Sequence, residues 1–206
     1  LYFWKDLWPF VKDKAETIAR IQLWLKIVLA FLPAAVLGVL LHSEIKKLFN
    51  PYTVAATLLV GGIVLIILER RKREGGIPTA RDIGFKTALF IGCIQCIAMI
   101  PGTSRSAATI IGAMVLGSSR LAAAEFSFFL AIPTMCGATA FEILKNGLHF
   151  NGTQWAVIGV GGAVSFLSAY AVVAFLMNYI RRHDFQPFGY YRILLGIAVF
   201  AYFLFA

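Results

Sequence analysis

Long runs of apolar residues dominate this chain, and they are the first feature that predicts its fold. Five runs approach or exceed the roughly 18 residues that a helix needs to cross a membrane. They cover residues 24–41, 52–68, 121–144, 155–180 and 189–206. The pattern predicts an all-α polytopic membrane protein, a helical bundle in which residues 1–206 form a single integral membrane domain with five spans.

A sixth apolar region, at about residues 86–118, has a different pattern. Two short apolar stretches, residues 86–100 and 107–117, flank Pro101 and Gly102. As helices they would extend about 21 Å and about 15 Å, and neither would cross a hydrocarbon core of about 30 Å. Because proline and glycine break helices, we expect a re-entrant helix-loop-helix hairpin with its loop near the middle of the membrane. One long, kinked helix is the alternative.

Basic residues are distributed unevenly, and their positions predict the topology. They cluster before the first predicted span, after the second, and after the fourth, where the sequence has Arg181, Arg182 and Arg192. The positive-inside rule then places the amino terminus in the cytoplasm and the carboxyl terminus outside. This topology requires residues 87–119 to enter and leave the membrane on the cytoplasmic side. The net charge of +9 therefore reflects membrane topology rather than nucleic-acid binding, because the basic run ERRKREGG contains no aromatic residues.

The loop of the predicted hairpin, PGTSRSAAT at residues 101–109, carries the candidate chemistry. Only 14% of the residues are charged and 60% are hydrophobic, so an arginine inside an apolar region is costly and indicates function. Arg105 can hold a phosphate through two parallel hydrogen bonds, and the neighbouring hydroxyls can donate to it or act as nucleophile. A helix that begins at Ala107 would add its free backbone N–H groups. The candidate catalytic residues are Arg105, Ser104, Ser106 and Thr109, and the candidate substrate-binding residues are Gly102 and Thr103.

A purely structural interpretation of the same loop stays open at this point. The hydroxyls would satisfy the broken backbone, and Arg105 would pair with an acid such as Glu125.

The segment PGTSRSAAT resembles the P-G-x-S-R-S-x-x-T motif of the bacterial undecaprenyl-pyrophosphate phosphatase family, also called the bacitracin-resistance family. On Ser104, Arg105, Ser106 and Thr109 the match is residue for residue, and the order of the spans is similar over residues 1–206. The resemblance implies an enzyme that hydrolyses undecaprenyl diphosphate to undecaprenyl phosphate and inorganic phosphate. It implies a site open toward the outer face of the bacterial inner membrane, recycling of the lipid carrier for cell-wall synthesis, and bacitracin resistance. It also implies an inverted-repeat architecture in which each repeat has a re-entrant helix pair.

The resemblance further implies a divalent cation, Mg²⁺ or Ca²⁺, and a first motif on an amino-terminal re-entrant pair. In that motif, paired acidic or glutamine residues precede a segment with serine and histidine. The sequence shows no counterpart, because the acids Glu69, Glu74, Glu125 and Glu142 lack this spacing within an apolar half-helix. We therefore expect that the amino-terminal repeat elements are missing, that this chain supplies no metal ligands, and that the 206 residues alone are inactive.

A lipid or anion transporter is the alternative function, because inverted repeats with broken helices are common in transporters. Three hydroxyl residues around one arginine favour the hydrolase, since hydrolysis needs a positioned nucleophile as well as an anion-binding group. The expected partner is the membrane lipid substrate, no nucleic acid is expected, and the sequence leaves a homodimer open.

Overall fold

The computed structural model describes residues 2–71, 76–147 and 150–205, which form helices and their connections. The helices are α1 (Trp4–Leu7), α2 (Lys14–Leu40), α3 (His42–Lys47), α4 (Pro51–Arg70), η1 (Ala80–Asp82), α5 (Phe85–Gln95), η2 (Cys96–Met99), α6 (Arg105–Val115), α7 (Arg120–Asn146), α8 (Gly152–Ile180) and α9 (Gln186–Phe205). By length and composition, five helices of the described residues can cross a membrane, namely α2, α4, α7, α8 and α9. The predicted all-α polytopic fold is confirmed.

The first spanning helix begins well before its predicted start. Helix α2 begins at Lys14, where the Asp13 side chain caps a free backbone N–H. Its first turns are polar, and ion pairs stabilise them. Glu16 pairs with Arg20 of the same helix at 3.0 Å and with Arg81 of η1 at 2.7 Å. An apolar run cannot reveal turns that ion pairs stabilise, which explains the difference.

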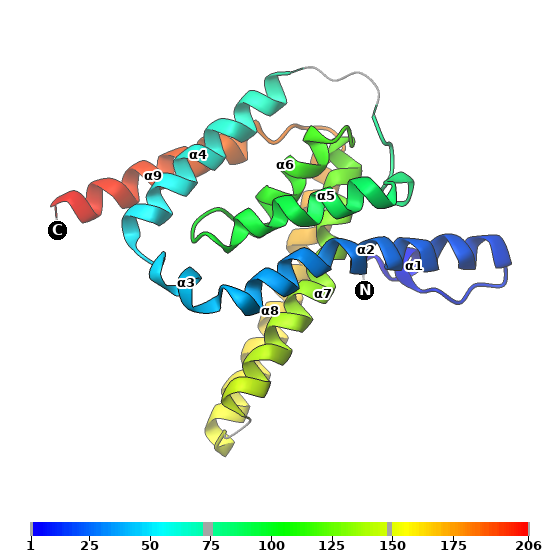
Figure 1. Ribbon diagram of the computed structural model, residues 1–206, viewed down its shortest axis with the longest axis horizontal. Coiled ribbons are helices and arrows are strands. Elements are labelled where there is room, and N and C mark those ends of the chain that lie inside the picture. Colours follow the sequence, from blue (N-terminus) through cyan, green and yellow to red (C-terminus); the bar gives the residue numbers. More distant parts are fainter. Residues whose placement is uncertain (1, 72–75, 148–149, 206) are drawn as a thin grey trace.

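The helices are arranged around the short pair α5 and α6 (Figure 1). Helices α4 and α9 lie side by side, and α7 and α8 run together away from the other helices. Helix α5 packs on α2, and α6 packs on α7 and α4. Contact between α5 and α2 is close, because a Cβ atom at Gly92 would overlap the carbonyl group of Ala30. The hairpin is therefore enclosed by α2, α4 and α7.

The two ends of the hairpin meet each other. Ile77 precedes α5, and its backbone N–H donates to the carbonyl oxygen of Gly117, after α6, at 2.9 Å. The N–H of Ser119 donates in turn to the carbonyl oxygen of Ile77 at 2.9 Å. The alternative of one long kinked helix is wrong, because α5 and α6 fold back on each other. Paired ends are what a re-entrant hairpin requires, although its depth in a membrane stays a prediction.

An ion pair between a buried carboxylate and a partly exposed arginine holds the helix ends together on the same side as these paired ends. Glu69, near the end of α4, has a fully buried side chain and accepts a hydrogen bond from Arg120 Nε at 2.8 Å. Its other oxygen accepts from the backbone N–H of Phe185 at 3.1 Å. Charged hydrogen bonds of this kind are strong, so this contact fixes α4, α7 and the α8–α9 connection relative to one another.

Candidate functional site

Helices α4 and α9 hold the hairpin loop in place. Gly102 has a φ of +86°, and a Cβ atom there would overlap Thr57 Oγ1 and the backbone of Val54. Thr57 Oγ1 donates to the carbonyl oxygen of Pro101 at 2.6 Å. Only glycine combines this backbone conformation with so close an approach. Gly102, predicted as a substrate-binding residue, is thus packed against α4.

Arg192 of α9 is a buried residue that contacts the hairpin loop, a position that the sequence does not predict. It was counted among the basic residues beside a cytoplasmic loop, yet it is only 8% exposed. Its Nη2 atom donates to the carbonyl oxygens of Gly102 at 3.0 Å and Thr57 at 3.3 Å. An isolated arginine inside an apolar run, the signal that singled out Arg105, could have identified Arg192 as well.

Ser104 caps the second helix of the hairpin. It is the N-cap of α6, and its Oγ atom accepts a hydrogen bond from the backbone N–H of Ala107 at 3.4 Å. The predicted helix start at Ala107 is therefore two residues late, since α6 begins at Arg105. The φ of Ser104 is +69°, a left-handed conformation that costs a non-glycine residue about 1–2 kcal/mol. Such strain is often found at functional sites, and here it brings Ser104 Oγ to 3.2 Å from Ser106 Oγ.

Arg105 is the first residue of α6, and its charge has no acidic partner among the ion pairs of the described residues. Its Nη1 atom donates to the carbonyl oxygen of Ser127 in α7 at 3.2 Å. Glu125 accepts instead from the backbone N–H of Ala80 at 3.4 Å. The alternative of an Arg105–Glu125 pair is therefore wrong. Because a guanidinium group has five N–H donors, most of the donors of Arg105 are available to a ligand.

The first turn of α6 separates two cavities. One, of about 300 Å³, is lined by Ser104, Ser106 and Arg192 together with apolar side chains from α7, α8 and α9. We call it the serine cavity. The other, of about 390 Å³, is lined by Arg105 and Gln95 and lies between α2, α5 and α7. We call it the arginine cavity. The predicted catalytic residues are thus adjacent in space but are divided between two sides of one helix end.

Two predicted threonines lie behind these cavities rather than facing them. Thr109 is fully buried, and its Oγ1 atom lies 2.6 Å from Ser127 Oγ. Since Ser127 also contacts Arg105 and lines the serine cavity, Thr109 positions the wall between the two cavities. Thr103 Oγ1 is buried and has no hydrogen-bond partner among the described residues.

The described residues contain no group of three or more His, Cys, Asp or Glu side chains that could hold a metal ion. Glu74, one of the acids considered above, lies outside the described residues. The implied Mg²⁺ or Ca²⁺ therefore does not fit the described residues of this chain.

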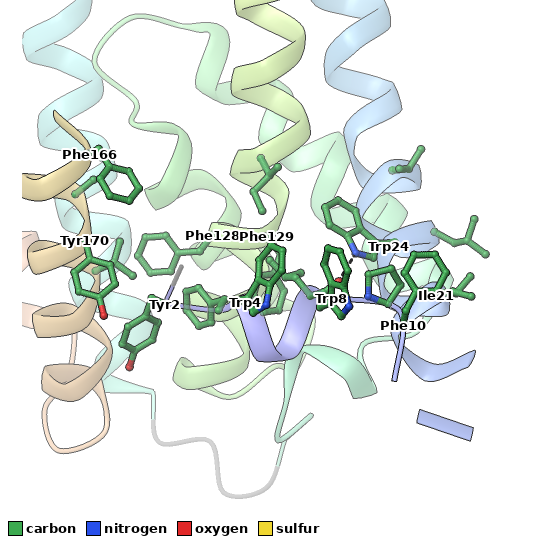
Figure 2. Close-up of a pocket in the computed structure, with 18 residues that line it drawn as sticks. Tyr2, Trp4, Trp8, Phe10, Ile21, Trp24, Phe128, Phe129, Phe166 and Tyr170 are labelled. Carbon is green, nitrogen blue, oxygen red and sulfur yellow. Dashed lines mark hydrogen bonds between the residues drawn. The ribbon is translucent and has the colours of Figure 1, made fainter. Parts of the chain in front are cut away.

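A larger, apolar cavity of about 870 Å³ lies between α1, α2, α7 and α8. We call it the aromatic groove. Figure 2 shows aromatic side chains around it, including Trp4, Trp8 and Trp24 on one side and Tyr170 of α8 on the other. It contains none of the predicted site residues, and an anion would find few polar partners there. The groove does adjoin the serine cavity, because Phe128 lines both.

Known proteins of one family are similar to nearly the whole chain. The family model described as Bacitracin resistance protein BacA matches residues 1–198. Undecaprenyl-diphosphatase 1 of Clostridioides difficile is 50% identical to the chain, over 98% of the chain and 74% of that relative. Undecaprenyl-diphosphatase of Fusobacterium nucleatum is 48% identical, over 97% of the chain and 77% of that relative. Undecaprenyl-diphosphatase of Enterococcus faecalis is 46% identical, over 96% and 74% respectively. The chain therefore belongs to the bacitracin resistance protein BacA family.

Proposed function

We propose that this protein hydrolyses undecaprenyl diphosphate to undecaprenyl phosphate and inorganic phosphate, and that its hairpin loop binds the diphosphate. The observation that supports this proposal most strongly is the environment of Arg105 at the first turn of α6. One of its N–H donors binds the carbonyl oxygen of Ser127, and its charge has no acidic partner among the described ion pairs. A permanent charge of this kind, beside free backbone N–H groups, is suited to phosphate oxygens. The names of the relatives support the same substrate.

The two cavities suggest how the diphosphate lies. The lipid-linked phosphate would occupy the serine cavity, where Ser104 and Ser106 donate hydrogen bonds to its oxygens. The lipid chain would continue past Phe128 into the aromatic groove, because that residue lines both spaces. The terminal phosphate would lie across the first turn of α6, against Arg105 in the arginine cavity. Both phosphates would then lie near the positive end of α6.

Catalysis in this arrangement rests on charge stabilisation. As the anhydride bond breaks, the terminal phosphoryl group passes to water and becomes inorganic phosphate. Negative charge develops on the oxygens of this transferred group and on the leaving undecaprenyl phosphate. Arg105 stabilises the charge on the transferred group, and Ser104 and Ser106 stabilise the leaving undecaprenyl phosphate. Arg192 and Thr57 keep the loop on α4 and α9, so the donors need no rearrangement during the reaction. The transporter alternative gains no support from the relatives, which are named as diphosphatases.

We also propose that the protein lies in the bacterial inner membrane, with its amino terminus in the cytoplasm and its site open to the outer face. The arginine cavity extends from Arg105 to His42 and Glu142. His42 and Glu142 lie near the carboxyl-terminal ends of α2 and α7, and the charge pattern assigns these ends to the outside. The finer prediction of a homodimer stays a prediction.

Hydrolysis is tested with the complete gene product purified in detergent. We expect it to release inorganic phosphate from undecaprenyl diphosphate in the presence of Mg²⁺ or Ca²⁺, and to release none from undecaprenyl phosphate, which has no anhydride bond. Phosphate release is measured colorimetrically, and the lipid product by chromatography. Binding of the lipid diphosphate without any release of phosphate would instead favour a transport protein.

Topology is tested with two cysteine substitutions that the structure tolerates. A Cβ atom at Gly84, before α5, or at Gly152, at the start of α8, would meet nothing within 4 Å. In a protein whose native cysteines are replaced, a membrane-impermeant thiol reagent should label Gly152→Cys on intact cells. It should label Gly84→Cys only after the cells are opened. Labelling of both on intact cells would contradict the proposed orientation.

A further inference from the structure

Residues 4–14 include α1 and lead into α2, and we call them the amino-terminal segment. The side chains of Trp4, Trp8 and Phe10 lie close together along it (Figure 2). The ring centroids of Trp4 and Trp8 are 4.5 Å apart, and those of Trp8 and Phe10 are 6.0 Å apart. These rings line the aromatic groove and are also exposed, Phe10 by 73% and Trp4 by 55%. The segment therefore presents a continuous aromatic surface.

Hydrogen bonds from α2 hold the amino-terminal segment in one conformation. Trp24 Nε1 donates to the carbonyl oxygen of Leu7 at 2.8 Å. Arg20 Nη1 donates to the carbonyl oxygen of Trp8 at 2.7 Å. A surface that is fixed in this way needs little ordering when it binds a partner. Since α2 can cross a membrane and begins at Lys14, the segment lies beside the end of a span.

The acidic side chains nearby do not neutralise the positive charge of this segment. Its basic side chains are all exposed, namely those of Lys5, Lys12 and Lys14. None of these lysines takes part in an ion pair among the described residues. Asp6 pairs with Arg81 at 3.3 Å, and Glu16 pairs with Arg20 and Arg81. Asp13 caps α2. The three ammonium groups are therefore available to an anionic partner.

The aromatic surface and the lysines together indicate the chemistry of that partner. Tryptophan rings favour the boundary between membrane and water, because they combine an apolar body with a polar N–H group. Lysines beside such rings at the end of a span attract anionic lipid head groups. A nucleic acid or an acidic protein would match the charge of the lysines, but it would not give the rings an apolar environment. A lipid surface satisfies both features.

We propose that the amino-terminal segment is a binding site for anionic phospholipids. Lys5, Lys12 and Lys14 contact the lipid phosphate groups, and the aromatic rings lie at the level of the head groups. The orientation proposed above places these lipids in the cytoplasmic leaflet, and the inference does not depend on the reaction. The lysines line none of the three cavities described above, so this site is separate from the hairpin loop.

Binding is measured with the complete gene product in micelles of an uncharged detergent. Phosphatidylglycerol or phosphatidylcholine with identical brominated acyl chains is added, and quenching of tryptophan fluorescence reports lipid near the rings. We expect phosphatidylglycerol to bind more than about tenfold more tightly, because each lysine near an anionic surface contributes about fivefold. Raising the salt concentration from about 0.1 M to about 1 M should largely remove this preference, since salt screens exposed charges. Equal affinity for the two lipids, or a preference that salt does not change, would overturn the proposal.

Three triple variants locate the effect. The first removes the charges of the segment and should lose the preference for phosphatidylglycerol: Lys5→Gln, Lys12→Gln and Lys14→Gln. The second keeps the charges and should keep the preference: Lys5→Arg, Lys12→Arg and Lys14→Arg. The matched control removes three exposed lysines that the charge pattern assigns to the outside, and it should also keep the preference: Lys46→Gln, Lys47→Gln and Lys145→Gln. A preference that persists in the first variant, or an equal loss in the control, would overturn the assignment to this segment.

The lipid site and the proposed function can fail separately. Lipid binding is measured without undecaprenyl diphosphate, so its absence would leave hydrolysis untouched, and a protein without hydrolysis could still bind the phospholipid. Micelles have no inner and outer face, so the result does not depend on the proposed orientation. The salt dependence needs no variant, so it tests the site even if the glutamine variant does not fold.

Discussion

Replacing Arg105 with lysine is expected to slow phosphate release at least about a hundredfold, because loss of one donor to a developing negative charge costs about 3 kcal/mol. Lysine keeps the positive charge but not the planar group that can bind two oxygens at once. Charge alone should therefore not restore the rate. Arg105→Ala should be slower still, since it also removes the charge.

The measurement is the initial rate of phosphate release by the complete gene product, with the thermal midpoint recorded in the same detergent. Arg182→Lys is the matched control, because Arg182 is exposed and the substitution has the same chemistry. It should leave both quantities unchanged. If Arg105→Lys stayed fully active, or lost activity only in proportion to a large loss of stability, Arg105 would be a structural residue.

Replacing Gly102 with alanine is expected to reduce activity about a hundredfold, the effect of moving reacting groups by about 1 Å. An alanine Cβ atom would overlap Thr57 Oγ1 and the carbonyl oxygen of Val54. The φ of +86° adds strain of its own for a residue with a side chain. Because the backbone of α4 cannot yield, the loop should move away from α4, and the start of α6 should move with it.

Gly117→Ala separates crowding from backbone strain. Gly117 has a φ of +92°, and a Cβ atom there would meet nothing within 4 Å. The Gly117→Ala variant should lose only the roughly 1–2 kcal/mol of unfolding free energy that a left-handed backbone costs alanine. It should keep most of its activity. Equal losses in the two variants, measured by phosphate release and thermal midpoint, would show that the contact between the loop and α4 is unimportant.

The sequence predicts the parts of this fold that depend on local pattern. The five spans follow from apolar length, and the loop follows from Pro101 and Gly102 between two stretches too short to cross a membrane. Helix ends are less predictable, because α2 begins with turns that depend on Glu16 pairing with Arg81 of η1. That partner is distant in the sequence and is recognised only in the folded chain.

The candidate site is likewise predicted only in part, because some of its residues are recognisable locally and others depend on contacts between helices. Arg105 and Ser104 are recognisable as a charge and a hydroxyl at a helix break. The position of Arg192 depends on the packing of α9 against α4, and the contact between Thr109 and Ser127 depends on the packing of α6 against α7. No periodicity or spacing contains this information, because each contact joins residues from different helices.

The central claim is that Ser104 and Arg105, on two sides of one helix end, act on a single diphosphate. The most direct test compares the initial rates of phosphate release from undecaprenyl diphosphate by the unsubstituted protein, Ser104→Ala, Arg105→Lys and the double variant. Residues that act as a unit give strongly non-additive losses, so the double variant should be about as slow as the slower single variant. If the two losses instead multiplied, the two residues would act independently, and the shared site proposed at the first turn of α6 would be contradicted.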